Sequence, residues 1–63
     1  MSFGTNLQYL RHMRDSMTQE ALAEKLDVSR QTISKWESDE AYPAMEKIFE
    51  LCDFFSCTMD QML

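Results

Sequence analysis

The stretch VSRQTISKW, residues 28–36, holds the side chains of this 63-residue chain that are best suited to binding chemistry. It carries two fixed positive charges, Arg30 and Lys35, together with short hydrogen-bonding side chains and no acid. On a helical wheel, Ile33 and Trp36 fall on one side, and a polar arc of roughly 140° lies opposite them. The polar arc consists of Arg30, Gln31, Ser34, Lys35 and Ser38.

Donors and acceptors of this kind match the edges of DNA bases. An α-helix fits the major groove, where Arg or Lys can donate to guanine and Gln can make a two-point contact with adenine. Short serine side chains let the helix come close, and an acid on this face would repel phosphates. Residues 28–36 therefore predict a helix that contacts DNA bases, although a polar arc is also the ordinary solvated face of a surface helix.

The distribution of charge along the chain supports contact with a polyanion, whereas the net charge of the whole chain does not. The net charge of −5 taken alone argues against nucleic acid. Residues 1–36, however, carry a net charge of +1, whereas residues 37–63 carry −6. The first half of the chain could therefore face DNA.

The composition favours helix, with one Gly, one Pro and many Leu, Met, Glu, Gln and Lys. A first helix is expected to begin at Ser2 or Thr5 and to end at Asp15. A second is expected over Gln19–Leu26, with Thr18 as its N-cap.

The helix within residues 28–36 is expected to follow a tight turn. Residues 27–29, Asp-Val-Ser, leave room for a short connection only, and Asp tolerates the left-handed conformation better than most residues. Ser29 is then the expected N-cap of a third helix, about Arg30–Ser38. Two helices joined this tightly form a helix-turn-helix arrangement.

Two more helices complete the expected fold. Pro43 lies at or just before the start of a fourth helix, whose expected buried face consists of Met45, Ile48, Leu51, Cys52 and Phe55. Thr58 and Gln61 form a capping box for a short fifth helix. That helix carries an apolar edge formed by Met59, Met62 and Leu63.

Other function classes find little support. Cys52 and Cys57 have no partners at metal-ligand spacing, so we expect reduced thiols and no metal site. No nucleophile and base are placed together, no glycine-rich phosphate loop is present, and His12 has no recognisable partner, which argues against an enzyme. No membrane span, signal peptide, cofactor or small-molecule ligand is indicated, and a cytoplasmic location is expected.

The residues TQEALAEKLDVSRQTISKWESDEAYP resemble the helix-turn-helix of the phage-repressor-like family of bacterial regulators, the λ repressor/Cro or XRE type. The resemblance extends through YPAMEKIFELCDFFSCTMDQML and so covers nearly the whole chain. It implies an all-α, compact five-helix λ-repressor-like domain over residues 1–63, which could be the N-terminal part of a longer regulator. The function it implies is sequence-specific binding of double-stranded DNA in transcriptional regulation.

The resemblance also implies roles for individual residues. Base-edge contacts fall on Arg30, Gln31, Ser34 and Lys35, and phosphate contacts on Gln19, Thr32 and Ser38. The position of Gln19 is also one that braces the recognition helix in the family. Glu37 matches a glutamate that pairs with an arginine of the first helix. The sequence match favours Arg11 as that partner, but the helical wheel leaves Arg14 as an alternative.

Several positions depart from the family pattern. Asp27, Asp39 and Ser56 stand where the family often has Gly, so the turn at Asp27 could be strained. Asp39 and Glu40 are expected near the phosphate path, where they could weaken non-specific binding. The segment between Arg11 and Gln19 is one residue longer than the usual pattern.

The expected partner is a palindromic DNA operator bound by a homodimer. One recognition helix contacts only a half-site, which is too little for typical specific affinity. The apolar edge at the C-terminal end offers a surface for dimerisation. The alternative is a protein-interaction or antitoxin-like module, in which the acidic half binds a partner and DNA binding is weak or vestigial.

Overall fold

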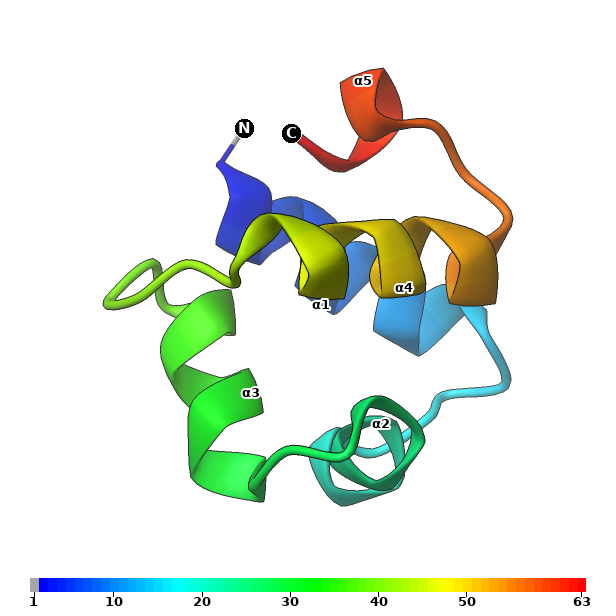
Figure 1. Ribbon diagram of the computed structural model, residues 1–63. Coiled ribbons are helices and arrows are strands. Elements are labelled where there is room, and N and C mark those ends of the chain that lie inside the picture. The colour runs from blue at the N-terminus through cyan, green and yellow to red at the C-terminus, as the bar shows by residue number, and fades with distance from the viewer. Residues whose placement is uncertain (1) are drawn as a thin grey trace.

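A computed structural model describes residues 2–63, which form five α-helices joined by short connections (Figure 1). The helices are α1 (Phe3–Met13), α2 (Gln19–Leu26), α3 (Arg30–Glu37), α4 (Met45–Phe55) and α5 (Met59–Met62). The all-α, five-helix architecture expected from the sequence is confirmed. None of the helices formed by residues 2–63 has the length and apolar character needed to cross a membrane.

Short polar side chains set where most of these helices begin. Thr18 and Ser29 accept a hydrogen bond from the backbone N–H three residues later, and Thr58 forms the expected capping box with Gln61. Of the two candidate starts for α1, Ser2 is the N-cap and Thr5 lies inside the helix. The exception is α4, whose cap residue Ala44 makes no side-chain hydrogen bond.

Left-handed residues set where several helices end. α1 stops at Met13 instead of continuing to Asp15, because Asp15 and Ser16 both have positive φ, at 56° and 53°. The three positions where the family often has Gly are also left-handed: the φ values are 57° at Asp27, 62° at Asp39 and 53° at Ser56. The unfavourable backbone expected at Asp27 is therefore present, and it recurs at the other two positions.

The core lies where α2, α3 and α1 meet, and α5 closes against α1 and α4. In Figure 1, α1 runs behind α4, α2 is seen nearly end-on, and the start of α1 lies near the C-terminal end of the chain. The buried cluster consists of Phe3, Leu7, Leu22, Ala23, Leu26, Ile33, Trp36, Leu51 and Met62. As expected, Ile33 and Trp36 anchor the inner side of α3.

Two expectations about the C-terminal helices were wrong. Met45, the first residue of α4, is 54% exposed, although it lies one helical turn before the buried Ile48 on the same side of the helix. Met62 is fully buried in the core instead of contributing to an exposed apolar edge, whereas Leu63 is 56% exposed. The edge proposed for dimerisation is therefore narrower than the sequence indicated.

Gly4 allows α1 and α3 to come into close contact. A Cβ atom at this position would lie 2.4 Å from the carbonyl oxygen of Glu37 and 2.7 Å from that of Trp36. Only a residue without a side chain fits such an approach of two backbones. The glycine thus fixes the distance between the first helix and the end of α3.

Candidate nucleic-acid interface

The outer surface of α3 presents the polar side chains that the wheel placed there. Arg30, Gln31, Lys35 and Ser38 are exposed, and Ser34 is half-buried. The inner side is held by Ile33, which is fully buried, and by Trp36. The helix is therefore anchored along one side, while most of the polar side chains on the other side are exposed.

The connection between α2 and α3 is short and closed by backbone hydrogen bonds and a cap. Asp27 is left-handed, and the N–H of Val28 donates to the carbonyl of Ala23 at 3.0 Å, which satisfies an orphan carbonyl at the end of α2. Ser29 then caps α3 directly. Ala23 is buried, and its small side chain allows α2 to pack on α3.

A buried ion pair joins α1 to the end of α3. Arg11 donates from Nε to Oε2 of Glu37 at 2.6 Å and from Nη2 to Oε1 at 3.0 Å. The two side chains are only 9% and 4% exposed. Arg11 also donates from Nη1 to the carbonyl of Met17 at 2.7 Å, so it holds the α1–α2 connection as well.

Arg14, the other candidate partner, lies elsewhere. Its guanidinium carbon stands 4.2 Å from the centre of the Phe54 ring, and Nη1 donates to the carbonyl of Phe54 at 2.7 Å. Arg14 follows the last residue of α1 and precedes the left-handed residues Asp15 and Ser16. Its side chain therefore binds the end of α4, and Glu37 is paired with Arg11.

Gln19 connects this ion pair to the polar arc. Its Nε2 donates to Oε1 of Glu37 at 3.0 Å, and its Oε1 accepts from Nη1 of Arg30 at 3.5 Å. The family resemblance implied that Gln19 braces the recognition helix, but it did not indicate these two particular contacts. They depend on where α1 and α3 lie in space, and no local pattern reports that.

The hydroxyl groups considered for phosphate contacts already have partners within the chain. Oγ of Ser38 donates to the carbonyl of Lys35 at 3.2 Å. Oγ1 of Thr32 lies 2.9 Å from Oγ of Ser29, and either atom can be the donor of that bond. Phosphate oxygens only accept, so Thr32 can turn its proton outward more easily than Ser38 can.

Asp39 has a partner that the sequence did not indicate. Its Oδ1 accepts from the backbone N–H of Gly4 at 3.0 Å, at the positive end of α1. The carboxylate is therefore directed toward a helix N-terminus within the domain. Its neighbour Glu40 is exposed.

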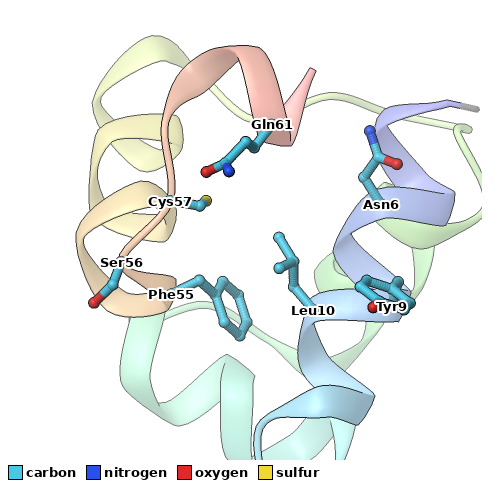
Figure 2. A pocket seen from close by; sticks show the side chains of 7 residues that line it. All are labelled: Asn6, Tyr9, Leu10, Phe55, Ser56, Cys57 and Gln61. Atoms are coloured by element: carbon cyan, nitrogen blue, oxygen red, sulfur yellow. The ribbon is translucent and has the colours of Figure 1, made fainter.

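The chain also has a groove that no residue of α3 lines (Figure 2). It lies between α1 and the α4–α5 connection, has a volume of about 570 Å³, and is lined by Asn6, Tyr9, Leu10, Phe55, Ser56, Cys57 and Gln61. Burial and the nearby Cys52 thiol raise the pKa of Cys57. None of the lining residues is charged or belongs to α3.

The arrangement of α2, the turn and α3 defines a helix-turn-helix domain whose second helix carries an exposed polar arc with two basic residues. Residues 7–62 match the family model described as helix-turn-helix. The chain therefore belongs to the Cro/C1-type helix-turn-helix family and is a DNA-binding domain, as the sequence predicted.

A curated relative agrees with this assignment. The HTH-type transcriptional activator BcrR of Enterococcus faecalis is 51% identical to the chain over 63 residues. That alignment covers 100% of this chain but 30% of the relative, so the chain spans less than a third of that protein's length. No solved structure matches the chain significantly.

Proposed function

We propose that this domain binds a specific sequence in double-stranded DNA inside the cell and thereby regulates transcription, with α3 in the major groove. The observation that carries the proposal is the outer side of α3, where Arg30, Gln31 and Lys35 are exposed on a helix whose other side is locked in the core. The name of the Enterococcus relative, a transcriptional activator, favours a regulatory role for the longer protein.

Individual side chains have distinct roles in this proposal. Arg30, Gln31, Ser34 and Lys35 contact base edges, since they occupy the exposed arc of a helix that fits the groove. Gln19, Thr32 and Ser38 contact phosphates, which fixes the register of the domain without specifying sequence. Gln19 retains a second amide N–H for this purpose, because only one is needed by Glu37.

The domain acts on DNA as a symmetric dimer bound to a palindromic site. A single α3 covers only a half-site, and two copies bound about one helical turn apart would supply the affinity of a specific complex. The exposed Leu63 and the half-buried Met59 offer apolar surface at the C-terminal end, although Met62 does not contribute. One chain per minimal high-affinity site would contradict this part of the proposal.

Selection of bound sequences from random duplex DNA tests the function directly. A palindromic preferred site should emerge, with affinity that falls steeply as salt is raised because phosphate contacts release counterions. Gln31→Ala should then weaken the free energy of binding to the preferred site by about 1–3 kcal/mol. It should also relax the preference at one base pair per half-site. Recovery of random sequences only, at every salt concentration, would refute sequence-specific binding.

A further inference from the structure

The two cysteines of the chain come together at the C-terminal end of α4. Cys52 lies in the last turn of that helix, and Cys57 is the second residue after it. We propose that this pair is a site of reversible redox modification, where a small disulfide is reduced by the two thiols and leaves Cys52 and Cys57 joined in one intramolecular disulfide. The proposal does not depend on DNA binding, because the groove beside the pair is not lined by α3.

The backbone at the end of α4 brings the two residues within reach of each other. Ser56 is left-handed, its N–H donates to the carbonyl of Asp53 at 3.3 Å, and the N–H of Cys57 donates to the carbonyl of Cys52 at 3.0 Å. These two bonds form a Schellman motif, in which the side chains of the outer two residues are commonly in contact. A backbone bond of this length also keeps the two Cα atoms within about 7 Å, the limit for bridging by a disulfide.

The surroundings of the two thiols agree with this backbone geometry. Cys52 and Cys57 are both half-buried free cysteines, and both pack against the same hydrophobic core. The Cys52 thiol lies close enough to Cys57 to add to the effect of burial in raising the pKa of Cys57. Two neighbouring thiols of this kind are the reduced form of a dithiol–disulfide couple.

Cys57 is the thiol that an oxidant can reach. It lines the groove of about 570 Å³, and Figure 2 shows its sulfur directed into that groove between Phe55 and Gln61. Cys52 is not among the lining residues. We therefore assign the first reaction step to Cys57 and the second to Cys52.

The reaction consists of two successive thiol–disulfide exchanges. The thiolate of Cys57 attacks one sulfur of the small disulfide, so that a mixed disulfide forms, the S–S bond of the oxidant breaks, and its other half leaves as a thiolate. The thiolate of Cys52 then attacks Sγ of Cys57, and the remaining half of the oxidant leaves. The two protons of the cysteines are taken up by the two leaving thiolates, and the two electrons reduce the oxidant.

The new bond would hold the connection that leads to α5. It would join the last turn of α4 to the residue before Thr58, which is the N-cap of α5. From there α5 places Met62 in the core, and the Met62 carbonyl accepts from the Asn6 amide of α1. A cross-link that fits the folded geometry restricts mainly the unfolded chain, so the oxidised chain should unfold at a higher temperature.

The test equilibrates the whole 63-residue chain with mixtures of reduced and oxidised glutathione, once in native buffer and once in urea at a concentration where circular dichroism shows it unfolded. Mass spectrometry after acid quenching distinguishes the loss of two hydrogen atoms from the addition of glutathione. The equilibrium constant for the internal disulfide should be at least about tenfold larger for the native chain than for the unfolded chain. The melting temperature should rise on oxidation.

Cys52→Ser and Cys57→Ser are the matched controls, because each removes one thiol and keeps nearly the same volume. Native Cys52→Ser should stop at the mixed disulfide on Cys57, and native Cys57→Ser should acquire glutathione more slowly. Alanine replaces serine in either variant that circular dichroism shows to be unfolded.

Three results would contradict the proposal. Equal equilibrium constants in native buffer and in urea would mean that the fold does not bring the thiols together. Mixed disulfides alone, or disulfides only between chains, would mean that Cys52 cannot reach Cys57. Equal rates of glutathione addition to the two native serine variants would overturn the assignment of Cys57 as the thiol that reacts first.

Discussion

The side of the molecule where α1 meets α3 and the side where α1 meets α4 and α5 are held together in different ways. Between α1 and α3, a buried ion pair and the contact at Gly4 leave little freedom for either helix, and Gln19 of α2 donates to the same carboxylate. On the other side, α1 reaches α5 through a bond from the Asn6 amide to the carbonyl of Met62, beside a groove of about 570 Å³.

This difference coincides with where the proposed function requires accurate geometry. Base readout needs side chains held within a fraction of an ångström, and buried polar contacts specify one arrangement more sharply than apolar packing does. The α4–α5 side only has to complete the core, which Leu51 and Met62 do while Phe49 remains 53% exposed. We therefore expect substitutions on the α1–α3 side to be the more damaging.

The largest effect is expected at the ion pair. Glu37→Gln removes the charge that compensates Arg11, whose side chain is only 9% exposed, and should lower the free energy of unfolding by roughly 3 kcal/mol. For a domain of this size, the melting temperature should then fall by more than about 10 °C. Thermal unfolding followed by circular dichroism measures the change.

Glu40→Gln is the matched control, because Glu40 lies three residues further on and is exposed. Its melting temperature should stay within a few degrees of the parent value, as expected for a surface substitution. Equal small shifts for the two variants would mean that the Arg11–Glu37 pair contributes little, and the contrast between the two sides would lose its main support.

The next effect is expected at Gly4. In Gly4→Ala, the added methyl would lie 2.4 Å from the carbonyl oxygen of Glu37, so α1 and α3 must move apart. Overpacking against backbone of this kind should cost about 1–3 kcal/mol in denaturant unfolding. Gln8→Ala, at an exposed position of the same helix, should be nearly neutral. An unchanged free energy of unfolding in Gly4→Ala would show that α1 and α3 can move apart at little cost.

The helices were predictable from sequence because their signals are local. Thr18, Ser29 and Thr58 each lie one residue before an apolar-periodic segment, and each is the N-cap of its helix. The end of α1 was not predictable, since helical periodicity continues through Asp15 although the backbone there is left-handed. Helix boundaries set by backbone conformation give a weaker signal in the sequence than boundaries set by a capping side chain.

The contacts within the candidate site were predictable only in part. The family resemblance indicated that Glu37 pairs with an arginine, but the choice between Arg11 and Arg14 depended on how the α1–α2 connection turns. The bond from Gly4 to Asp39 joins residues 35 positions apart, and no sequence spacing reveals such a pair. Periodicity places a residue on a face, whereas the partner on that face is set by the tertiary packing.

A smaller effect distinguishes two left-handed aspartates. Asp27→Gly relieves an unfavourable backbone conformation at φ 57° and should raise the free energy of unfolding by about 0.5–1 kcal/mol, after the greater freedom of unfolded Gly is allowed for. Asp39→Gly relieves a similar strain at φ 62° but removes the acceptor for the N–H of Gly4. It should therefore be neutral or destabilising, and equal gains for both would show that the Asp39 contact contributes nothing.

The smallest effect concerns the groove side and depends on pH. Burial first, and then the nearby Cys52, raise the pKa of Cys57 from its ordinary value of 9.0, so the folded chain holds this proton more tightly than the unfolded chain does. The contribution of this proton to the free energy of unfolding is fully present below about pH 9. It is lost as the pH rises through the raised pKa of Cys57 in the folded chain. Cys57→Ser should remove that alkaline decline, and Cys52→Ser should reduce it only in part, because burial is the larger cause. Urea unfolding from pH 7 to pH 10 under reducing conditions, compared as differences from the parent chain, cancels the titration of tyrosine and lysine. Parallel curves for the parent and Cys57→Ser would mean that the thiol on the wall of the groove is no more protected from water in the folded chain than in the unfolded one.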